Sequence, residues 1–201
     1  GLVPGDGETH QGLFDEALLS DMPGMTVYAP ANFAELELVL RRALYVHTGP
    51  VALRYPRGCP GACAFCDGED AAALTEPERP EATIVCCGIL VNEALEAAGL
   101  LAEEGRRVRV VKLLKLCPLP ELAGWADAPM LVAEEAAAAG GIGERAAAAL
   151  QGSGVRMGFA NTGASFPPCG DVASLRRLYG LDARGLAEAV RTLLRGGTEG
   201  K

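Results

Sequence analysis

Thr83-Ile84-Val85-Cys86-Cys87, followed at once by Gly88, is the strongest single indication of the fold class in this chain. It is an apolar run of strand length, and such runs are typical of strands buried on both faces of a parallel sheet. A helical pattern follows from about Val91 to Glu103 and ends before Gly105. A buried strand that leads directly into a helix is the repeating element of an α/β fold.

The same alternation continues towards the C-terminus. Apolar runs predict further strands at 108–113, 130–133 and 155–159. Helical patterns fall between them, near 122–125 and 140–150, and after them, to 179 and at 186–194, with Asp171 or Ser174 and then Asp182 as N-caps. We therefore predict a mostly parallel sheet with helices on both faces.

Towards the N-terminus, a short helix is predicted at 13–19, and residues 26–29 and 51–55 are predicted as strands on either side of a longer helix. Asn32 stands at the N-cap position of that helix and Glu35 at its capping-box position. The two strands of such a β-α-β unit should be parallel and adjacent. The apolar residues of the helix recur at intervals of three and four and predict a single apolar face: Phe33, Leu36, Leu40, Ala43 and Leu44.

Residues 59–82 separate these two patterns. They show no hydrophobic period and contain Pro60, Pro77 and Pro80 among several acidic residues, which is typical of a linker. The predicted organisation is a first unit at 1–58, a linker at 59–82, a second domain at 83–195 and a tail at 196–201. Because the chain begins at Gly1 without a methionine, we expect it to be part of something longer.

The composition narrows the class of protein. Of the 201 residues, 26 are acidic and 18 are basic, giving a net charge of −8 without a basic patch, which argues against nucleic acid or an acidic membrane as a partner. No apolar run has the length of a membrane span, and the first residues given do not show a charged region followed by an apolar one, the pattern of a secretory leader. We expect a cytoplasmic protein whose seven cysteines are reduced thiols.

The loop Gly5-Asp6-Gly7-Glu8-Thr9-His10-Gln11-Gly12 is the first candidate for chemistry. The imidazole of His10 can give and take protons near neutral pH. Asp6 could orient or charge that imidazole, and Gly7 and Gly12 let a substrate approach the backbone closely. The alternative is a polar turn that contains an incidental histidine.

The second candidate is Arg54-Tyr55-Pro56-Arg57, at the carboxyl end of a predicted strand, where ligands of parallel sheets gather. An arginine there can bind a phosphate group with two hydrogen bonds. Side chains alternate along a strand, so we expect Arg54 and Arg57 to have different roles. An ordinary surface arginine is the alternative, and His47 is interpreted as a capping or surface residue.

Two further motifs are interpreted as structural. Cys59, Cys63 and Cys66 have the C-x3-C-x2-C spacing of some iron–sulfur enzymes, but they follow a β-α-β unit, and too few further units come after them for such a barrel. Zinc would need a fourth ligand that no nearby residue supplies. Gly140-Gly141-Ile142-Gly143 opens a helix and could bind phosphate, but it follows the wrong strand for that role, so close backbone packing is favoured.

Three motifs in this order resemble the 1-deoxy-D-xylulose-5-phosphate synthase family, which is a group of transketolase-type thiamine diphosphate enzymes. They are Asp6-x-x-Thr9-His10-Gln11-Gly12, the segment 22–30, and the segment 49–58 with its Tyr-Pro-Arg-Gly sequence. Similar residues continue through nearly the whole chain, at 83–88, 93–94, 132–135, 140–143, 179–182 and 185–186.

The resemblance implies a fold and a reaction. Residues 1–58 would be the last part of a pyrimidine-binding domain and 83–195 a transketolase C-terminal domain. The family condenses pyruvate with D-glyceraldehyde 3-phosphate, with loss of CO2, for the synthesis of isoprenoid, thiamine and pyridoxal precursors. It uses thiamine diphosphate and Mg2+, and we expect a homodimer. His10 would handle protons at the reacting oxygens, Asp6 would be its acidic neighbour, and Arg57, beside Tyr55, would hold the phosphate of the aldehyde.

The chain also departs from the family pattern. The family's cofactor-activating glutamate, stacking aromatic residue and diphosphate–Mg2+ motif lie upstream and are absent here, and the cysteine-bearing linker is unusual. We therefore expect a partial active site that is inactive by itself. Two alternatives remain: the C-terminal subunit of a split transketolase-like enzyme, and a non-catalytic dimerisation module.

Overall fold

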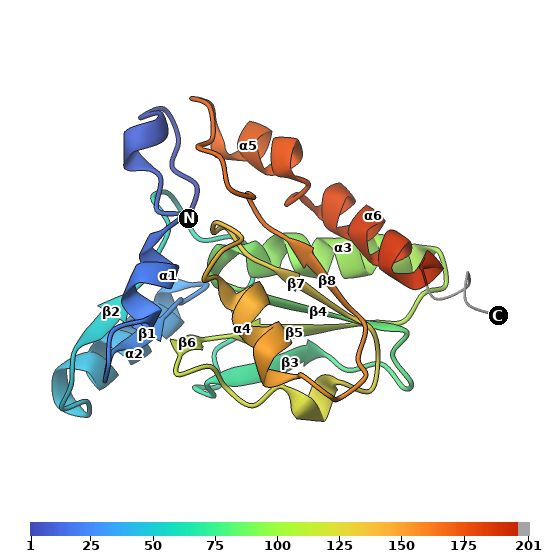
Figure 1. Ribbon diagram of the computed structural model, residues 1–201, viewed down its shortest axis with the longest axis horizontal. Coiled ribbons are helices and arrows are strands. Elements are labelled where there is room, and N and C mark those ends of the chain that lie inside the picture. The colour runs from blue at the N-terminus through green and yellow to red at the C-terminus, as the bar shows by residue number, and fades with distance from the viewer. Residues whose placement is uncertain (197–201) are drawn as a thin grey trace.

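The computed structural model describes residues 1–196, and its strands form two sheets (Figure 1). Apart from Gly196, the predicted tail at 196–201 lies outside the described residues. None of the helices within residues 1–196 is long and apolar enough to cross a membrane.

The larger sheet has the strand order β3-β5-β4-β7-β8, with the stretch around Ile84 at its centre. Strand β4 pairs in parallel with both β5 and β7, β7 pairs in parallel with β8, and the edge strand β3 is antiparallel to β5. All six residues of β4 are buried, as its composition predicts. The strands are β3 (Ala71–Thr75), β4 (Ala82–Cys87), β5 (Val108–Leu113), β7 (Met130–Ala133) and β8 (Met157–Ala160).

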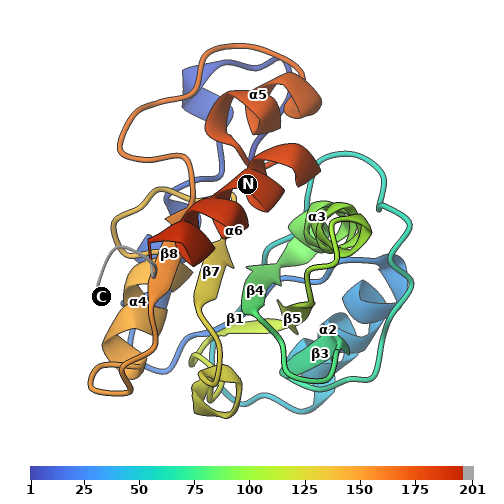
Figure 2. The same cartoon turned by 90° about the vertical axis from the view of Figure 1, so that its right-hand side faces the viewer.

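Helices cover both faces of this sheet, as predicted (Figure 2). Helices α3 and α6 pack against one face, while α4 and part of the first unit pack against the other. Asp171 and Asp182 are the N-caps of α5 and α6, and each accepts a hydrogen bond from the N–H three residues later. The helices are α3 (Val91–Glu103), α4 (Ile142–Ala149), α5 (Val172–Tyr179) and α6 (Ala183–Arg195), with single 3-10 turns η2 (Gly88–Leu90) and η3 (Ala123–Trp125).

The smaller sheet has the order β2-β1-β6 and contains the predicted β-α-β unit. Strands β1 and β2 are parallel and adjacent, which confirms that prediction. The Asn32 side chain caps α2 by accepting the N–H of Glu35. The elements are α1 (Asp15–Ser20), β1 (Thr26–Tyr28), α2 (Phe33–Tyr45), β2 (Val51–Leu53) and β6 (Lys115–Cys117).

Strand β6 was not predicted, and it changes the domain description. It follows β5 in the second half of the chain but pairs antiparallel with β1 of the first unit. The two units therefore share a sheet, and the boundary of the second domain at 83–195 does not separate all of its strands from the first unit. A strand of only three residues has too little pattern to be recognised in sequence.

The predicted linker at 59–82 is also partly a strand, because β3 occupies Ala71–Thr75. Its alanines give no alternation of polar and apolar residues, so only pairing with the free edge of β5 reveals it. The cysteine-bearing segment before β3 is held on both sides. The Asn32 side chain donates to the carbonyls of Cys63 and Phe65, and the N–H of Cys63 donates to Asn92.

The apolar stripe of α2 does not face the core of this chain. Phe33, Leu40 and Leu44 are exposed, with Phe33 69% accessible, while Glu35 and Val39 face inward. The stripe predicted from sequence is therefore present, but nothing within residues 1–196 covers it.

Candidate active site

The loop that carries His10 is a compact turn between the N-terminus and α1. Its central residues form a single 3-10 turn, η1 (Glu8–His10), and His10 is exposed to solvent. The Thr9 hydroxyl lies 2.9 Å from Nδ1 of His10. Gly5 and Gly7 have φ angles of 80° and 72°, which favour glycine.

The Gln11 side chain holds this loop together. Its amide oxygen accepts the N–H of Val3 at 2.8 Å, and its NH2 group donates to the carbonyls of Val3 and Gly7 at 2.9 and 3.3 Å. The N–H of Gly12 closes the loop on the Gly1 carbonyl. Because these bonds lie on both sides of His10, the imidazole stands on an ordered backbone.

The loop also rests on the C-terminal domain, next to α5 (Figure 1). The N–H of Gly5 donates to the Gly170 carbonyl at 3.1 Å, and the Cys169 thiol donates to the Gly5 carbonyl at 3.3 Å. The second domain therefore supports the loop from a position far away in the sequence.

Asp6 and Arg57 form an ion pair across the predicted site. The loop and the carboxyl end of β2 are thus brought together, although Asp6 was predicted to act on His10. Within residues 1–196 Asp6 makes no hydrogen bond to His10. Arg57 is 62% exposed and Asp6 36% exposed, so an incoming anion can reach the guanidinium.

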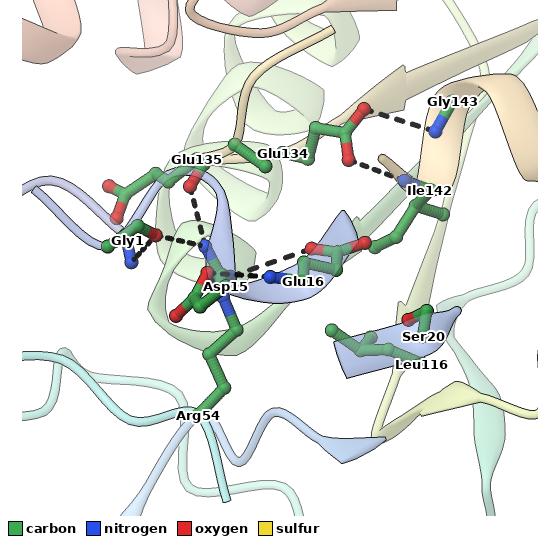
Figure 3. A network of polar contacts seen from close by, with 12 residues as sticks. Gly1, Asp15, Glu16, Ser20, Arg54, Leu116, Glu134, Glu135, Ile142 and Gly143 are labelled. Carbon is green, nitrogen blue, oxygen red and sulfur yellow. Dashed lines mark hydrogen bonds and ion pairs between the residues drawn. The ribbon is translucent and has the colours of Figure 1, made fainter. Parts of the chain in front are cut away.

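Arg54 has a different environment from Arg57, although β2 ends at Leu53 and both arginines lie beyond the strand to which alternation would apply. Its guanidinium is buried and donates to Asp15, to the Gly12 carbonyl and to the Glu135 carbonyl, at 3.0, 3.0 and 2.7 Å. It therefore ties the end of the His10 loop and the start of α1 to the end of β7 (Figure 3).

Tyr55 is 64% exposed and lies with Pro56 between two hollows. The smaller, of about 20 Å³, lies on the Arg54 side. The larger, of about 200 Å³, is mostly apolar and is lined by Pro30, Phe33, Leu36, Gly58 and Pro60 among others. Tyr55 thus stands at the rim of a surface that can accept an apolar group.

His47 and the cysteines, the other residues considered from the sequence, lie in the following surroundings. The Tyr28 hydroxyl lies 2.9 Å from Nε2 of His47, whose ring packs edge-on against the Tyr28 ring. All seven cysteines are free. Within residues 1–196, no group of three or more His, Cys, Asp or Glu side chains is arranged to hold a metal ion.

Sequence reasoning missed a group of buried acids next to Arg54. Glu134, at the end of β7, accepts the N–H groups of Ile142 and Gly143 at 2.6 and 3.1 Å. Burial, and then repulsion by Glu16, raises the pKa of Glu134 to about 7. The Glu134-Glu135 pair directly after a buried strand was the available signal, whereas nothing in the sequence marks Glu16 as buried.

Comparison with known proteins places both halves of the chain. The family model of the transketolase pyrimidine-binding domain matches residues 1–60. The model of the transketolase C-terminal domain matches residues 71–186.

The chain belongs to the transketolase family.

Within this family, the chain resembles proteins named 1-deoxy-D-xylulose-5-phosphate synthase. It is 38% identical to that of Bordetella parapertussis over an alignment 199 positions long, which covers 95% of this chain and 32% of the relative. It is 36% identical to that of Anaeromyxobacter sp. over an alignment 212 positions long, which covers 96% of this chain and 33% of the relative. The chain therefore spans about a third of the length of these relatives.

Solved structures give the same fold. A "split gene transketolase, inactive beta4 tetramer" has a TM-score of 0.81 and 30% identity, with 92% of this chain and 62% of that chain covered. The transketolase of Campylobacter jejuni has a TM-score of 0.76 at 19% identity, with 94% of this chain and 29% of that chain covered, a likeness of fold alone.

In this transketolase-family chain, the glycine-rich N-terminus of α4 does not fit the diphosphate of the family's cofactor. The Glu134 carboxylate already accepts the Ile142 and Gly143 N–H groups there. A Cβ atom at Gly141 would lie 2.5 Å from that carboxylate and one at Gly143 2.8 Å from Phe159. These glycines therefore serve close packing.

Proposed function

We propose that this chain is the C-terminal part of a cytoplasmic 1-deoxy-D-xylulose-5-phosphate synthase. The observation that carries the proposal is the Asp6–Arg57 ion pair, which joins the Thr-His-Gln-Gly loop to the Tyr-Pro-Arg-Gly strand end. The identity of 38% to enzymes of that name supports the choice of reaction. The substrates would be pyruvate and D-glyceraldehyde 3-phosphate, with CO2 as the second product. The product would serve the synthesis of isoprenoid, thiamine and pyridoxal precursors.

In this proposal the chain supplies the substrate half of the site. Arg57 binds the phosphate of the aldehyde, which competes with Asp6 for the exposed guanidinium. His10 holds or moves a proton at the reacting oxygens. Asp6 supplies negative charge near Arg57 and the His10 loop, and Tyr55 borders the bound substrate. Thiamine diphosphate with Mg2+ would supply the chemistry of carbon–carbon bond cleavage and formation. The residues that bind this cofactor would lie outside this chain.

The remaining part of the site would come from upstream sequence or from a partner chain, in a homodimer of the complete enzyme. The exposed stripe of α2, with Phe33, Leu40 and Leu44, supports this because apolar helix faces are normally covered. The likeness to a split-gene transketolase favours a second candidate, in which this chain is the C-terminal subunit of a split enzyme. A non-catalytic dimerisation module is the remaining alternative.

The genomic region upstream of Gly1 separates these candidates. An in-frame thiamine diphosphate-binding motif favours the C-terminal part of a single-chain synthase. A stop codon with a neighbouring gene for the missing part favours the split enzyme, and the absence of any such partner gene favours the dimerisation module. The assembled protein should then convert 13C-labelled pyruvate and glyceraldehyde 3-phosphate into labelled 1-deoxy-D-xylulose 5-phosphate, detected by NMR. Turnover of ketose phosphate donors without CO2 release would instead identify a plain transketolase.

A further inference from the structure

Glu16 is a buried carboxylic acid without a hydrogen-bond partner. It lies on α1 and its side chain is 0% exposed. Neither carboxylate oxygen has a hydrogen-bond partner among the described residues, and the nearest cation, Arg54, lies 3.8 Å away. A buried ionised carboxylate in such a position is costly unless it is paired and hydrogen-bonded. No part of the proposed reaction uses this group.

A second buried acid faces the same junction from the C-terminal domain (Figure 3). Glu134 is also 0% exposed, but it accepts two N–H groups at the start of α4. Donors at a helix N-terminus favour its charged form. Of the two acids, Glu16 is therefore the one that better tolerates a proton.

The cations near the junction donate their hydrogen bonds to groups other than Glu16. Arg54 lies 3.8 Å from Glu16, but its hydrogen bonds go to Asp15 and to two backbone carbonyls. Arg145 donates to the Ser20 hydroxyl and the Leu116 carbonyl. The groups that act electrostatically on Glu16 or Glu134 are the Gly1 ammonium, Asp15, Arg54, the Cys87 thiol and Arg145. Both guanidinium groups therefore place their hydrogen bonds on other acceptors, and an ionised Glu16 would be a buried anion that no cation or N–H group hydrogen-bonds.

The packing at this junction is tight where α1 meets the turn before α4. Helix α1 approaches the turn before α4 so closely that a Cβ atom at Gly140 would lie 2.6 Å from Cβ of Ala17. Within residues 1–196 no metal-binding group is formed by these acids. A bound proton remains as the simplest neutralising partner.

We propose that Glu16 and Glu134 form a proton-binding pair at the junction between the first unit and the C-terminal domain, with the proton mainly on Glu16. The packing of α1 against the turn before α4 is then stronger in mildly acidic than in mildly alkaline solution. Because Asp15 on the same helix is held by Arg54, which also holds Gly12, loosening of α1 also loosens the end of the His10 loop.

The direction of the pH effect follows from proton linkage. Burial raises the pKa of Glu16, and the pKa of Glu134 is raised to about 7. Above pH 4.5, the ordinary pKa of a glutamate, the folded chain therefore binds more protons than the unfolded chain. Stability from this pair is present below pH 4.5 and is lost as pH rises towards 7. Burial lowers the pKa of the Gly1 ammonium to about 6, which has the opposite effect between about pH 6 and 8.

A comparison with Glu16→Gln removes that opposing contribution. Urea unfolding of the 201-residue chain and of Glu16→Gln should be measured from pH 5 to pH 8.5. Relative to Glu16→Gln, the unfolding constant of the unaltered chain should increase by up to about tenfold per pH unit until the pair is ionised. Glu37→Gln, at an exposed ion pair on α2, is the matched control and should follow the unaltered chain. Parallel pH profiles for the unaltered chain and Glu16→Gln would overturn the proposal.

Infrared spectroscopy tests the protonation of Glu16 directly in the folded, unaltered chain. With 13C-labelled glutamate, the folded protein at pH 7 should show a protonated carboxyl band that disappears on unfolding. Glu16→Gln should lack this band, if it folds. A folded, unaltered chain in which every glutamate is ionised at pH 7 would overturn the proposal. Neither outcome depends on catalytic activity.

Discussion

Arg54 and Arg57 are separated by two residues and have opposite environments. Arg54 is buried and donates to three acceptors, whereas Arg57 is largely exposed and pairs with Asp6. The sequence predicts a difference from alternation along a strand to residue 55, but β2 ends at Leu53, so tertiary packing sets the two environments. The acceptors of Arg54 come from the His10 loop, α1 and β7, so only the folded chain identifies it as the residue that joins them.

Replacement of Arg57 by alanine in the assembled enzyme should weaken use of the phosphorylated aldehyde. We expect KM for glyceraldehyde 3-phosphate to increase at least tenfold, because a charge-assisted bond contributes about 1.5–3 kcal/mol. Steady-state kinetics with glyceraldehyde and glyceraldehyde 3-phosphate would measure this, since the aldehyde without phosphate should be unaffected. Arg41→Ala, at an exposed residue of α2, is the control. Equal losses with both aldehydes would contradict a role in phosphate binding.

Replacement of His10 by alanine tests proton handling at the same scale. Turnover of the assembled enzyme should decrease by roughly 10²–10⁴-fold, the usual contribution of a positioned acid–base group. The exposed position of His10 implies little change in the urea midpoint. His47→Ala, which removes the contact with Tyr28, should leave turnover within a few-fold. Unchanged turnover in His10→Ala would remove this residue from the mechanism.

At the scale of elements, α2 is held to β5 by a fully buried ion pair. Lys112 and Glu35 are both 0% exposed and in contact, and the Lys112 ammonium lies 4.8 Å from the centre of the Phe65 ring. Glu35 also accepts the N–H of Ala31. The cysteine-bearing segment thus covers a charged contact between the two units, which its sequence does not indicate.

Lys112→Met should destabilise the chain strongly, because it leaves Glu35 buried and unpaired. Loss of one partner of such a pair typically costs about 3–5 kcal/mol. Urea unfolding would show this loss, and the double variant Lys112→Met/Glu35→Leu should recover much of it. Arg41→Met, at the exposed pair with Glu37, should change stability by less than about 1 kcal/mol. Additive losses in the double variant would contradict the pairing.

At the scale of the whole molecule, the first unit and the C-terminal domain are joined by shared structure. Strand β6, in the second half of the chain, pairs with β1 of the first unit, and the His10 loop contacts the segment before α5. The apolar stripe of α2 is uncovered within residues 1–196, and the chain spans about a third of the length of its relatives. Both observations agree with the proposal that the assembled enzyme is larger than this chain.

The 201-residue chain should therefore be catalytically silent by itself. With thiamine diphosphate and Mg2+, it should release no CO2 from 1-13C-pyruvate above the rate of a protein-free control. Addition of the missing part of the enzyme should restore release. Decarboxylation by the isolated chain would show that the cofactor site is complete within it and would contradict the prediction.

The sequence by itself determined the α/β class and most elements of the fold. The apolar run at 83–87 is long enough, and apolar enough, to be stable only as a strand buried on both faces, and it is the central strand of the larger sheet. The β-α-β unit and the caps Asn32, Asp171 and Asp182 follow from equally local chemistry. His10, Asp6, Tyr55 and Arg57 were selected from spacing and resemblance.

The tertiary structure decided what those residues contact. Strands β3 and β6 exist because free sheet edges accept them, and not because their own short sequences favour a strand. Asp6 pairs with Arg57, and Glu16, Glu134 and the Lys112–Glu35 pair are buried, because elements distant in sequence pack over them. The hydrophobic pattern of a segment indicates which of its faces must be buried. The partner of a buried charge depends instead on which elements pack together.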